Sequence, residues 1–424
     1  MQLRLAVALA VMLAPCRLAA QDGASSPSVP QGPAPQIDLL DLWHKIRGRE
    51  PDAQAQKEPQ GLMIAAMPII GRNPTSGLTF GVAGQVAFIA GNPETTRISS
   101  AVSSLSFSTK NQILVNVRFD AYTSDSTWLI EGDNRVYKAG ESVYGLGTNT
   151  PSSAAVDANY TWLRLHETIY KRVRGPFYVG GGLLFDSHTH IRPATVTDEE
   201  WQASPFIVYS ERHGLPTGSQ QSGGISANAL FDRRVGEIDP RSGWMAQASY
   251  RASYKGFLSG DSSWQLAHLE VRSYVPLSAQ PDQATKSAGG VPAKHRLAFW
   301  GFADLTTRGV PPYFDLPTTV SDTYGRSSRG YIMGRYRGER MVYGEVEYRQ
   351  MLTENGLLGL VAFANTTTVT DRSTGEELFH SYAPAAGAGL RALFNKHSRT
   401  NLCIDFAFGK DGAKGVYLAI QDAF

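Results

Sequence analysis

The sequence has little cysteine, little charge and no long apolar run beyond its N-terminus. Of its two cysteines, Cys16 lies in the N-terminal leader described below, and Cys403 alone cannot form an intramolecular disulfide. Charged residues make up 18% of the 424 residues, against about 25% in soluble domains. No stretch of roughly 18 apolar residues follows the leader, which excludes a membrane-spanning helix. The sequence therefore has few charged residues, yet it has no apolar run after the leader that is long enough for a membrane-spanning helix.

The sequence also lacks the signatures of nucleic-acid binding and of common enzymes. Its net charge is only +2, and lysine and arginine are scattered without a basic block, so we expect no nucleic-acid partner. There is no G-x-S-x-G motif, and the glycines at 180–182 lie inside a strand pattern, not between a strand and a helix. We therefore expect no enzyme activity and no cofactor.

One short pattern has two interpretations. Asp186, His188 and His190 share one side of a predicted strand, an arrangement that suits a metal ion. The same residues lie at a strand end beside a long loop, which favours a polar rim over a metal site. We predict no metal site.

The N-terminal 60 residues divide into a leader, a linker and a helix. Residues 1–20 have the features of a secretory signal peptide, with Arg4, an apolar run and Ala20 before the expected cleavage site. The alternative, a lipoprotein signal at Cys16, fits less well because proline precedes the cysteine. Residues 21–60 form a periplasmic linker, expected to be disordered where proline, serine and glycine dominate.

Residues 37–47 interrupt this linker with an amphipathic helix. Leu39, Leu42, Trp43 and Ile46 recur at helical spacing. The helix either docks on the protein itself or acts as a membrane-surface or barrel-plugging element.

From residue 61 to 424, apolar and polar residues alternate in segments that are separated by turn residues. Ile113, Val115 and Val117, for example, alternate with Asn116 and Arg118, which is the period of a strand with one apolar and one polar face. Each segment is long enough for a tilted bilayer crossing of roughly 9–11 residues. We predict strands at 61–71, 77–90, 97–108, 112–123, 126–138, 158–172, 176–190, 221–233, 242–254, 263–275, 294–307, 340–353, 356–367, 383–394, 399–409 and 414–424.

The gaps between these segments alternate in length. The long gaps 139–157, 191–220, 308–339 and 368–382 all follow odd-numbered strands. Most gaps after even-numbered strands are short, with 276–293 as the exception. Short periplasmic turns with longer outer loops are typical of outer-membrane barrels. The sequence thus predicts an all-β fold, a transmembrane antiparallel barrel of about 16 strands with a periplasmic N-terminus.

The end of the chain fits this interpretation. Val416, Leu418, Ile420 and Phe424 fall on one parity, as in a strand with one apolar face that ends on an aromatic residue. An ordinary half-buried strand has the same pattern. In an outer-membrane barrel, we expect these four residues to form the C-terminal insertion signal and the last strand to form the closing edge of the barrel.

Charges of both signs occupy the polar parity and should face the lumen, because an arginine or lysine in mid-bilayer costs roughly 2–4 kcal/mol. These residues are Arg118, Asp120, Glu131, Asp133, Arg135, Arg164, His166, His268, Glu270, Arg272, Glu345, Glu347 and Arg349.

Several motifs resemble the BamA/TamA superfamily of bacterial surface antigens. Residues 231–244 are similar to its Asp-Arg turn that leads into a strand, and residues 269–277 to its next strand. Residues 325–331, which contain Arg329, Gly330 and Tyr331, resemble the family's Val-Arg-Gly-Phe/Tyr loop motif between strands 11 and 12. Residues 67–77 and 144–150 resemble its first hairpin and its third outer loop.

The resemblance implies that the motif loop folds back into the lumen as a latch. It also implies that Arg329 binds polar groups on strands 12 and 13, here Glu345, Glu347 and Asn365, with the ring of Phe363 nearby. Family members carry an aspartate where this chain has Asn365. An amide brings no charge, so its hydrogen bond to the guanidinium should be weaker, and the two glutamates could compensate.

The family's periplasmic polypeptide-transport-associated domains, which receive substrate proteins, find no counterpart here. Residues 21–60 are too few to hold one. Two functions therefore stay open. One is assembly, insertion or translocation of proteins or lipids at the outer membrane, with the seam between first and last strands as the working gate. The other is a passive porin-like channel or structural barrel. Expected partners are outer-membrane lipid and client membrane proteins, and the oligomeric state stays open.

Overall fold

The computed structural model describes residues 36–48, 61–73, 77–278, 293–422 and 424. The chain divides into Met1–Ala34, which lies outside these residues, and Pro35–Phe424, which contains all of them. The predicted signal peptide and most of the predicted linker at 21–60 therefore lie outside the described residues.

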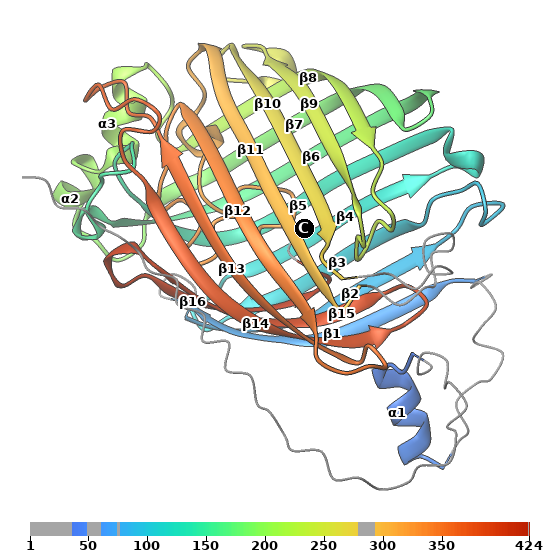
Figure 1. Ribbon diagram of the computed structural model, residues 1–424. Coiled ribbons are helices and arrows are strands. Elements are labelled where there is room, and N and C mark those ends of the chain that lie inside the picture. Colours follow the sequence, from blue (N-terminus) through green and yellow to red (C-terminus); the bar gives the residue numbers. More distant parts are fainter. Residues whose placement is uncertain (1–35, 49–60, 74–76, 279–292, 423) are drawn as a thin grey trace, which may run out of the picture. The chain divides into compact units, whose positions relative to one another are not determined.

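The described part of Pro35–Phe424 contains one sheet of sixteen strands, in which each strand pairs antiparallel with the next along the chain (Figure 1). This confirms the predicted all-β barrel. The strands are β1 (Met63–Asn73), β2 (Gly77–Phe88), β3 (Ser99–Ser108), β4 (Ile113–Tyr122), β5 (Trp128–Val143), β6 (Val156–Arg174), β7 (Phe177–Pro193), β8 (Ser219–Asp232), β9 (Gly243–Ser253), β10 (Trp264–Pro276), β11 (His295–Gly309), β12 (Arg340–Met351), β13 (Leu358–Val369), β14 (Ala383–Asn395), β15 (Thr400–Gly409) and β16 (Lys414–Ile420).

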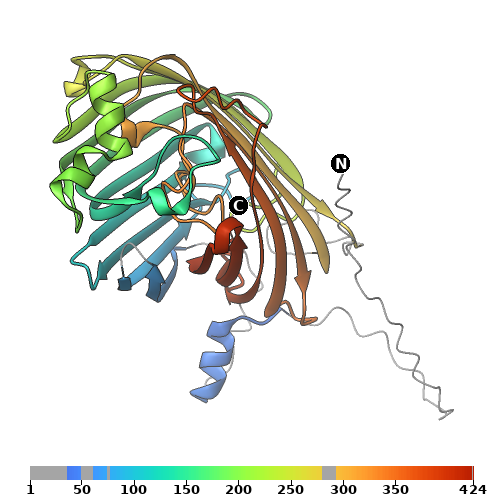
Figure 2. The ribbon, with the colours of Figure 1, turned by 90° about the vertical axis from the view of Figure 1, so that its left-hand side faces the viewer.

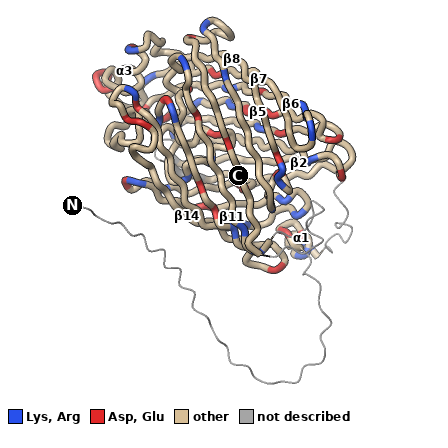
Figure 3. Tube along the Cα trace, turned by 45° about the horizontal axis from the view of Figure 1, so that its top comes forward, with Lys and Arg blue, Asp and Glu red and all other residues tan. Residues whose placement is uncertain are grey.

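The period-two pattern gives this barrel an apolar outside and a polar inside. Phe406 is half exposed on the outer face of β15, whereas its neighbour Asp405 is buried inside. Charged residues of both signs are interspersed along the strands and do not form a block of one sign (Figure 3). This is the distribution expected of strands that face lipid on one side and a polar lumen on the other.

The two ends of the barrel differ as the gap lengths predicted. Helices α2 (Asp198–Gln202) and α3 (Pro205–Arg212) lie in the long connection between β7 and β8. Helix α1 (Leu39–Ile46) lies at the opposite end, beside the turn that follows β14 (Figures 1 and 2). We call the end with the short connections, where α1 lies, the turn end. The amphipathic helix predicted at 37–47 is thus present, one or two residues shorter at each end.

None of the helices in the described residues is long and apolar enough to cross a membrane.

The prediction for the C-terminal strand was wrong at its end. β16 stops at Ile420 and does not continue to residue 424, because Gln421 has a φ of 74° that breaks the extended backbone. Phe424 is 6% exposed and packs on Trp300 and Tyr274 inside the barrel. Phe424 therefore does not face lipid, and the role of the four terminal residues as an insertion signal stays a prediction.

Candidate functional site

The connection between β11 and β12, residues 310–339, runs inside the ring of strands (Figure 2). We call this segment the lumen loop. Asp322 shapes its turn, since its carboxylate accepts hydrogen bonds from the backbone N–H groups of Tyr324, Arg326 and Ser327. Gly330 has a φ of 114°, and a Cβ at this position would lie 2.8 Å from the Cβ of Ala385. A glycine is therefore required where the loop tip meets β14.

Arg329 holds the tip of the lumen loop to the barrel wall. Its guanidinium is 2% exposed and donates hydrogen bonds to Glu345, to Glu347 at 2.6 Å and to Asp405 at 2.7 Å. Its Cζ also lies 3.5 Å from the centre of the Phe363 ring, which adds a cation–π contact. Burial alone would lower the pKa of Arg329, but the three carboxylates raise it well above its ordinary value. The guanidinium is thus permanently charged.

The arginine belongs to a larger set of paired charges. Arg349 donates to Glu347 at 2.7 Å, and Arg391 contacts both Asp405 and the carboxylate of Asp422. Of the three carboxylates that bind Arg329, Glu347 and Asp405 therefore each have a second arginine as a partner. Such a network is stable only while all its members are present, because removing one leaves a buried charge unpaired.

The two residues after Arg329 tie the lumen loop to the last strands. The backbone N–H of Gly330 donates to the hydroxyl of Tyr417 on β16 at 2.8 Å. The hydroxyl of Tyr331 donates to the carbonyl of Pro384 at 2.6 Å and accepts from the N–H of Lys410 at 2.8 Å. The tip of the lumen loop therefore bridges β12 to β16.

The structure places the expected partners of Arg329 around it, with two differences. Asn365 donates its amide N–H to the backbone carbonyl of Arg329 at 3.1 Å, so it binds the loop backbone and not the guanidinium. The sequence analysis did not identify Asp405 as a partner, although its inward parity on β15 was visible. Alternation predicts the face on which a residue lies, but it does not predict the register across β13 and β14 that brings Asp405 of β15 close to the carboxylates of β12.

A second arginine of the lumen loop holds the C-terminus inside the barrel. The guanidinium of Arg326 donates to the backbone carbonyls of Ile420, Gln421 and Asp422. Arg349 donates to the backbone oxygen of Phe424 at 2.7 Å. The residues that follow β16 therefore turn inward, away from the line of the strand.

The seam between the first and last strands is unpaired in the described residues. Every consecutive pair from β1–β2 to β15–β16 is joined by a backbone ladder. β1 and β16 are neighbours in space, yet no backbone pairing joins them within the described residues. The barrel therefore has two adjacent strand edges whose N–H and C=O groups lack a ladder partner.

The start of the lumen loop is packed at the end of the barrel that carries α2 and α3. Phe314 packs on Phe206 of α3 and on the ring of His188, and the hydroxyl of Tyr209 donates to the carbonyl of Pro311. Arg337, near the end of the loop, pairs with Glu141. This aromatic cluster, which we call the outer cap, occupies the barrel end that carries α2 and α3.

His188 and His190 do not form a metal set. His188 is buried and stacks between Trp162 and Phe314. His190 has a φ of 55° beside a register irregularity and is exposed, so the two imidazoles are not on one side of the strand. The expectation of a shared face was wrong because a local irregularity breaks the period of two. Across the described residues, no group of three or more ligand-type side chains is arranged to hold a metal ion.

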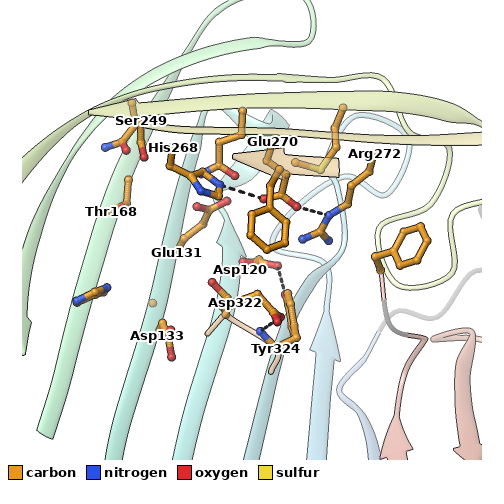
Figure 4. Close-up of a pocket in the computed structure, with 18 of the residues that line it drawn as sticks. Asp120, Glu131, Asp133, Thr168, Ser249, His268, Glu270, Arg272, Asp322 and Tyr324 are labelled. Carbon is orange, nitrogen blue, oxygen red and sulfur yellow. Dashed lines mark hydrogen bonds and ion pairs between the residues drawn. The ribbon is translucent and has the colours of Figure 1, made fainter. Parts of the chain in front are cut away.

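A cavity of about 340 Å³ remains between the lumen loop and the wall (Figure 4). Asp120 accepts a hydrogen bond from the hydroxyl of Tyr324 at 3.1 Å. On the opposite side, Glu270 pairs with His268 at 3.4 Å and with Arg272 at 2.6 Å. Eight of the thirteen charged residues predicted to face the lumen thus line a polar chamber that the loop partly fills; they are Asp120, Glu131, Asp133, Arg164, His166, His268, Glu270 and Arg272.

Neither a family model nor a curated protein sequence matches this chain. Solved structures that are similar include BamA from Haemophilus ducreyi lacking POTRA domains 1–3, with 16% identity and a TM-score of 0.51 over 86% of this chain and 70% of that one. CdiB from Acinetobacter baumannii has 12% identity and a TM-score of 0.53, and CdiB from Escherichia coli has 10% and 0.50. Each CdiB match covers 86% of this chain, which spans only 60% and 63% of the two proteins. At these identities the likeness establishes the barrel fold.

Proposed function

We propose that this chain is an outer-membrane barrel that takes part in the assembly, insertion or translocation of proteins or lipids. The observation that carries the proposal is the unpaired seam between β1 and β16. A barrel in a membrane ordinarily closes its ladder, because an unpaired backbone group in hydrocarbon costs several kcal/mol. An open seam gives an incoming strand or lipid a lateral path that a closed wall does not offer.

The lumen loop supports this proposal over a passive channel. Its tip is bound to β12, β13 and β15 by Arg329, and its start is packed into the outer cap. A diffusion channel needs a continuous aqueous path, and a loop bound at both ends of the lumen obstructs one. In the proposed mechanism, the loop stiffens the β12–β16 side of the wall, and opening takes place between β16 and β1.

The proposal includes the topology and the compartment. The chain is exported with its signal peptide at 1–20, spans the outer membrane through residues 61–424, and keeps its N-terminal segment and its turn end in the periplasm. An even number of strands returns both chain ends to the same side. The resemblance to the BamA/TamA superfamily supports the choice of proteins or lipids as clients.

Purified barrel in liposomes tests the proposal. One assay follows the assembly of a second, urea-denatured outer-membrane barrel, and a parallel assay follows movement of labelled lipid between leaflets. Faster client assembly or lipid movement than in empty liposomes supports the proposal. Liposome swelling in small sugars, with neither of these activities, would instead identify a passive channel.

A further inference from the structure

Helix α1 has an apolar face that the protein leaves uncovered. Trp43 is 50% exposed and Ile46 is 79% exposed, and none of the eight helical residues is buried. The helix is nevertheless held in place. Asp38 caps it and accepts from the backbone N–H of Lys396, and Asp41 pairs with the Lys396 ammonium at 2.8 Å. The acidic side is therefore docked on the barrel while the apolar side is free.

The attachment fixes α1 at the edge of the outward-facing wall of the barrel. The backbone N–H of Ile37 donates to the carbonyl of Asn355 in the β12–β13 turn. That turn is flanked by Leu352 and Leu358, which are both more than 40% exposed. Helix α1 therefore begins beside a turn whose flanking residues are apolar and exposed on the outer face.

The turn end also carries an aromatic belt with the same chemistry as α1. Trp128, Phe177 and Trp244 are exposed and lie within the first two residues of their strands at this end. The ammonium of Lys171 lies 5.3 Å from the centre of the Trp128 ring, and the guanidinium of Arg47 lies 4.3 Å from that of Trp43. Exposed tryptophans with a cation above the ring are typical of the boundary between acyl chains and headgroups.

The charges on α1 suit an anionic surface. At helical spacing, Arg47 borders the face of Trp43 and Ile46, so its long side chain can extend toward headgroups, whereas Lys45 falls between Asp38 and Asp41. The acidic residues of this helix, Asp38 and Asp41, are both engaged with Lys396 and lie on the docked side. The free face is therefore apolar at its centre and cationic at the border next to Trp43.

We propose that α1 is a membrane-surface anchor. Trp43 and Ile46 enter the interfacial region of the leaflet at the turn end, and Arg47 binds an anionic phospholipid headgroup. The anchor would tether the N-terminal segment beside β12–β15. This inference does not depend on the proposed transport activity, since it concerns only how the barrel end meets lipid.

Tryptophan quenching by brominated phospholipid tests the anchor in the full-length barrel. In a Trp128→Phe, Trp244→Phe background, Trp43 is the remaining exposed tryptophan among the described residues, and the other four are buried. The barrel is reconstituted in phosphatidylethanolamine–phosphatidylglycerol vesicles with bromine placed either near the headgroup or deep in the acyl chain. Because interfacial helices lie about 5–10 Å into the boundary, we expect on the order of twofold stronger quenching by the shallow bromine. Adding Trp43→Phe should remove this difference, whereas adding Trp201→Phe in the outer cap should not.

Two further measurements separate lipid from other occupants. Replacing Arg47 by glutamine, or phosphatidylglycerol by phosphatidylcholine, should weaken the shallow quenching. If the tryptophan variants do not assemble, an Ile46→Cys, Cys403→Ala barrel replaces them, and its thiol should resist an impermeant reagent in vesicles. The thiol of a Ser124→Cys, Cys403→Ala control, exposed in the β4–β5 turn, should react. The proposal is overturned if bromine does not quench Trp43 or if the thiol at position 46 reacts freely. It is also overturned if protection of that thiol rises with the protein-to-lipid ratio, because that result would indicate a second copy of the protein as the occupant.

Discussion

Removing the Arg329 side chain should destabilise the barrel more than any other single truncation in the lumen loop. The guanidinium neutralises three carboxylates within hydrogen-bond distance, and only two of these, Glu347 and Asp405, have another arginine as partner. Removing one partner of a buried ion pair costs about 3–5 kcal/mol, because the remaining charge stays buried. The lost contact with Phe363 adds about 0.5–2 kcal/mol. Together these two terms lead us to expect that Arg329→Ala lowers the free energy of unfolding by about 3.5–7 kcal/mol.

The assay is urea unfolding of the purified barrel in lipid vesicles, followed by the heat-modifiable band and by tryptophan fluorescence. Arg329→Lys keeps the charge but loses the planar fork that reaches several carboxylates, so it should show an intermediate loss. Arg174→Ala is the matched control, since Arg174 is an exposed arginine at the β6–β7 turn and its removal should change stability by no more than about 0.5 kcal/mol. A loss below about 1 kcal/mol for Arg329→Ala would refute the reasoning.

Three further predictions follow from single contacts. Asn365→Asp should weaken the barrel by about 1–3 kcal/mol in the same urea assay, because the bond to the carbonyl of Arg329 is lost and a further carboxylate is placed opposite Glu345; a gain in stability would contradict this. Phe406→Arg should reduce the folded barrel in membranes, at a cost of roughly 2–4 kcal/mol, whereas Ser249→Arg in the cavity wall should not; equal yields of heat-modifiable protein would refute the register. Burial and the nearby Asp186 raise the pKa of Asp315 from 3.8 to about 7, so its contribution to stability is present below pH 3.8 and is lost as pH rises through about 7. Asp315→Asn should flatten that part of the stability profile, and an unchanged profile would show that Asp315 does not titrate there.

The barrel could be predicted from the sequence because its signals are local. Strand period, turn residues and the alternation of gap lengths each depend on neighbouring residues, and together they determined strand number, order and facing. Val117 and Phe406, for example, alternate with polar neighbours in the sequence, and their side chains are exposed on the outer face as that alternation predicts. The error at His190 shows the limit of this reasoning, since one residue with positive φ changes the side on which the following side chains lie.

The parts that could not be predicted depend on contacts between distant segments. Asp405 meets Arg329 only through the stagger of four strands, and a sequence pattern does not encode that stagger. Phe424 follows the lipid parity of β16, yet Gln421 turns the chain and Arg326 binds the last carbonyls. The aromatic terminus therefore lies on Trp300 in the lumen, where an isolated strand pattern would never place it.

A reversible lock across the seam tests the central claim most directly. Cysteine pairs are scanned between residues 64–70 of β1 and 415–420 of β16 in a Cys403→Ala barrel, and a pair that forms a disulfide is identified by gel mobility. The control is an Ala229→Cys, Ala248→Cys barrel, which bridges the already paired strands β8 and β9. We predict that the locked seam abolishes client assembly or lipid movement in liposomes, that a reductant restores it, and that the control disulfide has no effect. Undiminished activity with the seam locked would contradict the account.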